Sequence, residues 1–154
     1  MSSITLHKPG ASADGANAHV QARRRSDPAY HAYLLLRIGF TVLPLLFGID
    51  KYFNGLVYWP KYLAHWIAAI PPGTPQQIMY GVGAVEILAG LVVALKPRYG
   101  GYLVSLWLAG IVVNLFSYSG FYDIAMRDFG LMLAALTLAR LAAVYDPPLR
   151  LRRR

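Results

Sequence analysis

Apolar residues gather in four long stretches along the chain, at about residues 33–50, 77–95, 100–121 and 127–145. Each stretch is close to the length that a helix needs to cross the ~30 Å hydrocarbon core of a bilayer. None shows the strict alternation of apolar and polar positions that marks a half-buried strand. Because only helices and closed barrels satisfy their backbone groups in lipid, the pattern predicts an all-α fold, a four-helix transmembrane bundle.

The connections between the stretches carry clear turn signals. "KPRYGG" at 96–101 separates the second stretch from the third, and "YDIAMRD" at 122–128 separates the third from the fourth. The longer connection after the first stretch contains "YWPKYLAHWIAAI" and then "PPGTP". Its segment at about 61–70 is too short to span a bilayer and places tryptophan and tyrosine beside Lys61 and His65, which predicts a short interfacial amphipathic helix.

The ends of the chain differ from its middle. Residues 1–29 are polar and rich in glycine, serine and alanine, which predicts a disordered tail. Residues 30–148 form the predicted four-span membrane domain, and 149–154 a basic tail. Three arginines before the first stretch invite a twin-arginine signal interpretation, but Arg37 inside the apolar run and the lack of a small-residue cleavage site argue against it.

Charge is scarce and unevenly placed. Only 14% of residues are charged, against about 25% in average soluble domains. With four spans both termini lie on one side, which collects ten basic residues, whereas the other side has three, Lys51, Lys61 and Arg127. The positive-inside rule then predicts a multi-pass protein of the bacterial inner membrane with both termini in the cytoplasm. The net charge of +8 flanks apolar blocks and forms no groove-sized patch, so nucleic acid is not an expected partner.

One carboxylate, Glu86, lies at the centre of "GVGAVEILAG" in the second span. A charged residue in the bilayer is costly, and such residues face the bundle interior and find a partner. Arg37 and Arg140 are the two expected partners, because both can reach inward from the cytoplasmic side. Gly83 and Gly90 on the same face would let another helix approach closely. Three roles stay open for Glu86: a structural ion pair, a protonatable or ligand-binding carboxyl, and a neutral hydrogen-bonded side chain.

A second group of polar residues is expected on the outer face. Asn114, about two turns below the outer end of the third span, lies deeper than this outer group. It is grouped instead with Glu86, Arg37 and Arg140 as a candidate ligand or proton site. The outer group has three interpretations: loop salt bridges with membrane anchoring, a ligand or quinone-headgroup pocket roofed by Trp59 and Trp66, and a docking face for an extrinsic subunit. Its members are Asp50, Lys51, His65, Asp123, Arg127 and Asp128.

Cofactor signatures are sparse. The chain has no cysteine, which excludes disulfides, thiol redox chemistry and cysteine-ligated clusters within it. The four histidines, at positions 7, 19, 31 and 65, all lie outside the middles of the spans, so a haem held between two helices by histidine is not expected. No metal site or covalently bound cofactor is predicted. A quinone remains a candidate for non-covalent binding, because 13% of residues are aromatic.

Three segments within about residues 34–145 carry a resemblance: "LRIGFTVLPLLFGIDKYF", "MYGVGAVEILAGLVVALKPRYGGYLVSLWLAGIVVNL" and "FYDIAMRDFGLMLAALTLARL". Together they resemble the DoxX-like family of small bacterial membrane proteins. The resemblance implies a four-helix membrane bundle. Some family members are small subunits of a thiosulfate:quinone oxidoreductase or partners of redox enzymes, which implies a similar association here. No catalytic residue carries over, and the positions Arg37, Glu86, Arg127, Asp128 and Gly130 match only as polar or packing positions.

The favoured function is therefore a non-catalytic accessory or anchoring subunit of a larger membrane assembly, respiratory or otherwise redox-linked. Its partners would be the lipid bilayer and one or more proteins. The first alternative is a membrane subunit of a quinone-linked oxidoreductase, in which Glu86 or His65 handles a proton and a partner delivers electrons. The second is a small transporter or channel, which would need a hydrated path from Glu86 to the outer polar group.

Overall fold

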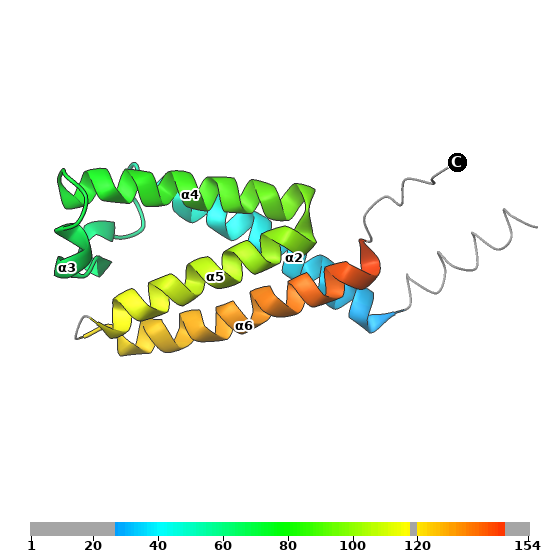
Figure 1. The fold of residues 1–154 in the computed structure, drawn as a ribbon. Coiled ribbons are helices and arrows are strands. Elements are labelled where there is room, and N and C mark those ends of the chain that lie inside the picture. The colour runs from blue at the N-terminus through cyan, green and yellow to red at the C-terminus, as the bar shows by residue number, and fades with distance from the viewer. Residues whose placement is uncertain (1–26, 118–119, 147–154) are drawn as a thin grey trace, which may run out of the picture.

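The computed structural model describes residues 27–117 and 120–146. Four long helices run back and forth along one axis, and two short helices lie in the connection between the first and second of them (Figure 1). The elements in chain order are α2 (Pro28–Asp50), η1 (Trp59–Tyr62), α3 (His65–Ala68), α4 (Pro75–Leu95), α5 (Pro97–Phe116) and α6 (Tyr122–Tyr145).

The starts of three long helices follow from the sequence. Pro28, Pro75 and Pro97 occupy the first turns of α2, α4 and α5, where the missing N–H costs nothing and the fixed φ angle favours a helix. Asp27 caps α2 by accepting from the Ala29 N–H, and Thr74 forms a capping box with Gln77 at α4. Local chemistry therefore fixes where these helices begin, before any of them packs on another.

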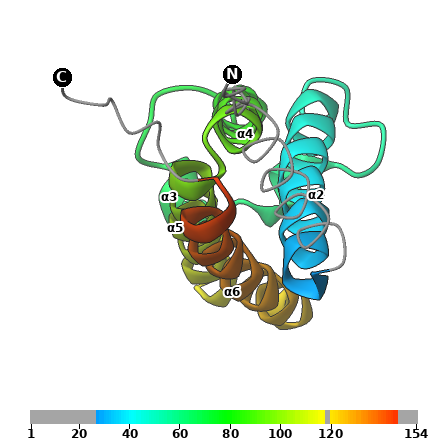
Figure 2. The ribbon, with the colours of Figure 1, turned by 90° about the vertical axis from the view of Figure 1, so that its right-hand side faces the viewer.

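The four long helices form a ring in the order α2, α4, α5, α6, seen along the axis in Figure 2. Packing is closest within the pairs α2–α4 and α5–α6. The end of the bundle that carries Asp27 and Tyr145 is called the terminal end here, and the end with η1 and α3 the loop end. A cluster of buried side chains fills the terminal half of the ring, made of Tyr33, Phe40, Ala89, Val93, Val104, Ala135, Leu138 and Ala142.

Glycines set the close contact between α2 and α4. A Cβ added at Gly83 would lie 2.6 Å from the Gly48 carbonyl oxygen, and one at Gly90 would lie 2.9 Å from the Thr41 carbonyl oxygen. Both distances are too short for a real side chain, so the two backbones touch only because these positions are glycine. The prediction that Gly83 and Gly90 admit a neighbouring helix is confirmed, and that neighbour is α2.

The register of this contact leaves α2 shorter than α4 at the loop end. Gly48 lies against Gly83, and α2 ends two residues later at Asp50, whereas α4 continues for eight residues from Gly83 to its start at Pro75. At 1.5 Å per residue, α2 stops about 9 Å short of the end of α4. Figure 1 shows α4 running on past the end of α2 to reach the level of α3. The chain from 51 to 64 therefore occupies the space that the missing turns of α2 would have filled.

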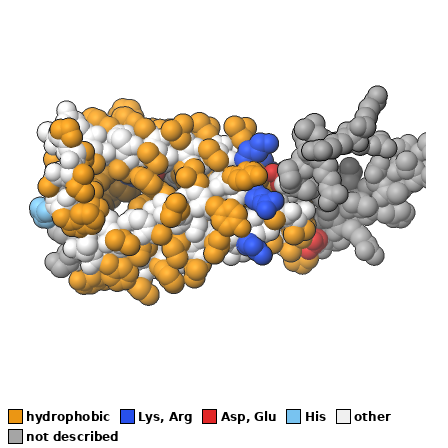
Figure 3. Space-filling model, in the orientation of Figure 1, with side chains coloured by type: hydrophobic (Ala, Val, Ile, Leu, Met, Phe, Trp, Pro, Cys, Tyr) orange, Lys and Arg blue, Asp and Glu red, His pale blue; other side chains and the backbone are white. Residues whose placement is uncertain are grey.

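All four long helices are long and apolar enough to cross a membrane. Their outer surface is mainly apolar, and Lys and Arg side chains gather in a band toward the terminal end (Figure 3). The predicted all-α, four-span architecture is confirmed, and the chain is a multi-pass membrane protein. The predicted tails, residues 1–29 and 149–154, lie almost wholly outside the described residues.

Several predicted boundaries were wrong. Helices α2 and α6 begin at Pro28 and Tyr122, five residues before the expected starts at 33 and 127, so "YDIAMRD" at 122–128 is helical and does not separate two spans. In "KPRYGG" only Lys96 lies between helices, because α5 begins at Pro97.

The third span ends at Phe116 and not at 121, because the chain turns at Ser117, whose hydroxyl donates to the Asn114 carbonyl oxygen. The single interfacial helix expected at about 61–70 is instead split into η1 and α3. Ala64, between them, is extended, and its N–H is bound by the Asn114 side chain, so it cannot continue a helix.

We expect Gly83→Ala to destabilise the bundle by about 1–3 kcal/mol, because the new methyl group must push α2 away from α4. Thermal unfolding in mild detergent measures the change. Gly81→Ala is the matched control: it lies on the same helix, and a Cβ there meets nothing within 4 Å. The control should unfold at the wild-type temperature or slightly above it. Equal effects of the two substitutions would contradict the close α2–α4 contact.

Candidate functional site

A buried ion pair lies at the centre of the membrane domain. The Lys51 ammonium donates to the Glu86 carboxylate at 2.6 Å, and the two residues are only 4% and 9% exposed. Glu86 is eleven residues from the start of α4 and nine from its end, which places it close to mid-membrane. Lys51 follows directly on the last residue of α2. It reaches this depth only because α2 stops early.

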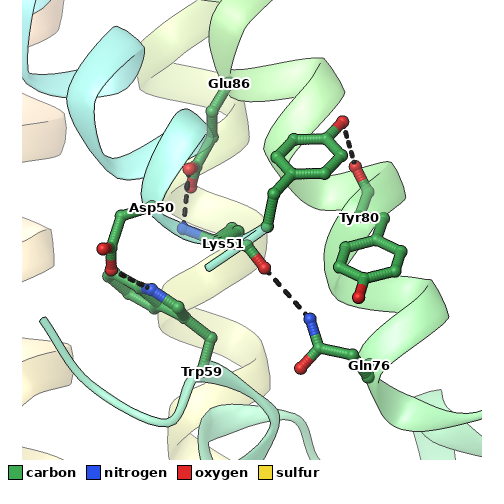
Figure 4. Close-up of polar contacts among 7 residues, drawn as sticks. Asp50, Lys51, Trp59, Gln76, Tyr80 and Glu86 are labelled. Carbon is green, nitrogen blue, oxygen red and sulfur yellow. Dashed lines mark hydrogen bonds and ion pairs between the residues drawn. The ribbon is translucent and has the colours of Figure 1, made fainter. Parts of the chain in front are cut away.

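The surroundings hold Lys51 in place (Figure 4). Its ammonium nitrogen lies 3.7 Å from the centre of the Trp59 ring, and its backbone carbonyl accepts from the Gln76 side chain. The Trp59 indole N–H in turn donates to Asp50 at 2.7 Å. A cation over an indole face in a dry environment gains electrostatic energy beyond the ion pair itself. Lys51 is therefore held by Glu86 and Gln76 from α4 and by the Trp59 ring from η1.

Two further side chains complete the centre. Asp128, half-buried on α6, interacts electrostatically with both Glu86 and Lys51. Trp107, on α5, adjoins Glu86, but its indole N–H is buried without a hydrogen-bond partner among the residues that the structure describes. The centre thus combines one cation, two carboxyl groups and the indole N–H of Trp107, which interacts with Glu86 without a well-aligned hydrogen bond. Each of the four long helices or their ends contributes one of these groups.

A cavity of about 90 Å³ lies beside Glu86 and Trp107. Apart from these two residues its walls are apolar, and all four long helices contribute to them: Phe40, Leu43, Pro44, Phe47, Ala89, Val104, Leu108, Ile111 and Leu131. On α2 and again on α5, the lining positions follow the spacing i, i+3, i+4, i+7 of one helix face. That spacing indicates, from the sequence alone, that Trp107 lies on the same helix face as Val104 and Ile111. Trp107 was not among the predicted site residues.

Most of the other polar side chains near the loop end bind loop backbone. Asp50 accepts from the N–H groups of Gly55 and Leu56. Asn114 accepts from the Ala64 N–H at 2.9 Å and donates to the Tyr62 carbonyl at 2.8 Å. Non-helical backbone is tolerated at membrane depth only where protein satisfies its polar groups. These side chains, predicted as candidates for a ligand site, therefore hold the 51–64 segment in the bundle.

The prediction that Glu86 pairs with Arg37 or Arg140 was wrong. Arg37 donates to the Ala94 carbonyl at 2.6 Å and to the Tyr33 hydroxyl, so it binds the last turn of α4, where a cation is favourable. Arg140 is exposed. Arg140 lies nine positions after the cavity-lining Leu131, which is an offset of about two and a half helical turns. The Arg140 side chain therefore points away from the interior. No local pattern indicated that Lys51, at the expected end of a span, would reach Glu86.

The predicted outer-face group is divided in the structure. Lys51 and Asp128 belong to the buried centre, whereas Asp123 and Arg127 form an exposed pair on α6 with 3.5 Å between nitrogen and oxygen. His65 begins α3 and is exposed at the loop end. The neighbouring Trp66 donates through its indole N–H to the Ser117 hydroxyl at 2.8 Å.

The terminal end is held by an aromatic and polar contact. The Tyr145 hydroxyl donates to the Asp27 carboxylate, joining the end of α6 to the start of α2. This hydrogen bond, helped by one from the Ala29 N–H, holds the pKa of Asp27 below its ordinary value. The Tyr30 ring packs edge-on against Tyr145, with 5.4 Å between ring centres. These contacts close the ring of helices far from the ion pair.

Comparison with known proteins gives one match. The family model DoxX matches residues 32–118, which cover most of α2 and all of η1, α3, α4 and α5, and so include Lys51, Glu86 and Trp107. The chain belongs to the DoxX family. No curated protein and no solved structure matches the chain. The predicted family is confirmed, and with it the reading of the chain as a small membrane protein of this family.

We expect Lys51→Met to cost about 3–5 kcal/mol of stability, because it leaves Glu86 and Asp128 buried without their cation. Glu86→Gln should cost less, since Asp128 remains to balance Lys51. The double variant Lys51→Met/Glu86→Leu should recover much of the loss, because it removes both charges of the pair together. Unfolding in detergent measures all three.

Arg127→Met is the control for these variants, because it removes an equal charge from an exposed pair. Its effect should stay within about 0.5 kcal/mol. If Glu86→Gln proved as damaging as Lys51→Met, Asp128 would not be acting as a second counter-charge.

Proposed function

We propose that this DoxX-family protein is a small accessory subunit that anchors a larger assembly, respiratory or otherwise redox-linked, in the bacterial inner membrane. One observation carries the proposal: the polar side chains at the centre of the bundle are used to hold its fold. Asp50 and Asn114 bind loop backbone, and Lys51 binds Glu86. Side chains bound in this way stabilise one conformation of the bundle, and their hydrogen bonds are accounted for by the fold. This supports an architectural role without catalysis by the chain itself.

The charge distribution supports the orientation that goes with this proposal. Lys96 joins α4 to α5, Arg98 lies in the first turn of α5, and Arg37 and Arg140 lie toward the same end of the bundle. The positive-inside rule places that end, and with it both termini, in the cytoplasm. The loop end, with its exposed tryptophan and histidine in α3, then faces the outer side, where an extrinsic partner would meet it.

We expect the protein, extracted from native membranes in a mild detergent, to elute with at least one other membrane or peripheral protein. Chemical cross-linking before extraction, followed by mass spectrometry, identifies the companions and the contacting residues. A tagged four-span membrane protein of another family, expressed at the same level, is the control for adventitious capture. Elution as a lone monomer, without cross-links to other chains, would overturn the subunit proposal.

The cavity favours a second candidate function, a membrane subunit of a quinone-linked oxidoreductase. Its walls are apolar, and it lies at mid-membrane beside a buried carboxylate. The cavity has a volume of about 90 Å³ and opens to the surface of the bundle, so the carbonyl edge of a quinone ring could enter it while the rest of the molecule lies in lipid. Because the chain has no cysteine, thiols of its own could not relay electrons, and a partner would supply them.

For this second candidate, we expect lipid extracts of the purified protein to contain quinone above the level of the surrounding membrane. Liquid chromatography with mass spectrometry measures the ratio of quinone to protein. Ile111→Phe, which fills the cavity from a partly exposed wall position, should lower that ratio several-fold. Quinone at membrane background in both proteins would remove this candidate and leave the accessory role standing.

A further inference from the structure

We infer that the cavity beside Glu86 is a binding site for a neutral, membrane-soluble molecule whose oxygen accepts a hydrogen bond from Trp107. The molecule would occupy the same cavity as the quinone candidate but need not be a quinone. The hydrogen-bond donor, the route of entry from lipid and the charge of the bound molecule each follow from a separate observation.

The donor is the indole N–H of Trp107. It is buried, lies beside the Glu86 carboxylate and interacts with it, but makes no hydrogen bond of good geometry within the described residues, although it lines a cavity with room beside it. Buried donors in native proteins nearly always have a well-aligned acceptor, so this N–H has capacity for another one. The apolar walls disfavour water, because an apolar cavity stays dry and takes apolar molecules. An oxygen carried on an apolar body satisfies both the donor and the walls.

The route is lateral, between α2 and α6. Leu43, Phe47 and Leu131 line the cavity and are also 43%, 39% and 42% exposed on the surface of the bundle. At this depth the surface of a membrane protein faces hydrocarbon. A molecule dissolved in the bilayer can therefore reach the cavity without crossing the headgroup region.

The charge requirement comes from the buried centre. Lys51 and Glu86 balance each other, and Asp128 adds a second carboxylate that interacts with both. Because Lys51 is already paired with Glu86, an anion such as a fatty acid carboxylate would enter a medium of low dielectric constant without a cation free to pair with it. A molecule with an alcohol or carbonyl oxygen and no charge avoids that cost.

Depth narrows the chemical class further. Glu86 is about 14–16 Å from either end of α4, near the middle of the bilayer. The ester oxygens of phospholipids lie in the interfacial region, outside the hydrocarbon core. The acceptor must therefore belong to a molecule whose oxygen can lie deep in the hydrocarbon, such as a long-chain alcohol, an isoprenoid alcohol or a neutral carbonyl compound.

The test is photolabelling of the purified protein in lipid nanodiscs. The probes are three ten-carbon chains with a diazirine at the same position, ending in a hydroxyl, a carboxylate or a methyl group. Mass spectrometry locates the labelled residues. We expect the alcohol to label 40–47 of α2 and the region of Leu131, with the carboxylate and hydrocarbon labelling these segments about five- to tenfold less, as the loss of one hydrogen bond implies.

Two substitutions separate the hydrogen bond from the fold. Trp107→Phe keeps an aromatic ring but removes the N–H, and it should lower labelling by the alcohol about five- to tenfold while leaving labelling by the hydrocarbon unchanged. Trp66→Phe is the matched control, because Trp66 lies in α3 and donates to Ser117. It should leave both unchanged. The unfolding temperature of each variant shows that the bundle is intact.

Each outcome decides the inference. Equal labelling of wild type and Trp107→Phe by the alcohol would overturn the role of the indole donor, and labels spread evenly over the lipid-facing helices would overturn the site. Stronger labelling by the carboxylate would overturn the charge requirement. Unlabelled decylubiquinone, added as a competitor, tests the quinone candidate separately: if it fails to displace the alcohol, that candidate falls and the alcohol site stands.

Discussion

A helix that stops inside a bilayer leaves backbone groups that no water can satisfy, and this constraint governs the loop half of the protein. Because α2 ends about 9 Å before α4 does, the 51–64 segment lies at a depth where the surrounding lipid offers no hydrogen bonds. Protein side chains satisfy it instead. Asp50, Asn114 and Gln76 bind its N–H and carbonyl groups from three different helices. Asp50, Asn114 and Gln76 thus make a short non-helical segment stable at a depth where lipid surrounds the bundle.

The same early ending explains the ion pair. A lysine at the end of a full-length span would lie at the surface in water. Here the end of α2 is inside, so Lys51 is buried and needs a counter-charge, which Glu86 supplies from the middle of α4. The glycines at 48 and 83 set the two helices close enough for a 2.6 Å contact. Ion pair, loop and helix contact are thus parts of one arrangement, and a change in any of them affects the others.

The terminal and loop halves of the bundle have different tasks. The terminal half is well packed, with small and aromatic side chains such as Ala89, Val93 and Tyr33 filling the ring, and the Asp27–Tyr145 contact closes it. The cavity lies where the two halves meet, because Phe40, Ala89 and Val104 belong both to its walls and to the packed cluster, whereas Phe47 and Ile111 line it toward the loop end. A packed half that closes the bundle and a cavity beside Glu86 fit the proposal of a subunit that is anchored in lipid and binds a membrane-soluble molecule.

The sequence by itself determined the four spans, the membrane location and the family, because these depend on local composition and on the length needed to cross lipid. The proline and capping signals at Pro28, Pro75 and Pro97 were also present in the sequence, but the expected starts lay two to five residues after them. The sequence also singled out Glu86 as a residue that needs a partner. Only the tertiary structure decided which partner, since the choice between Lys51 and the arginines depends on the axial offset of α2 against α4. That offset comes from which glycines meet across the helix contact, a pairing of distant residues that no local pattern records. The position of Trp107 beside Glu86 depends on the same packing.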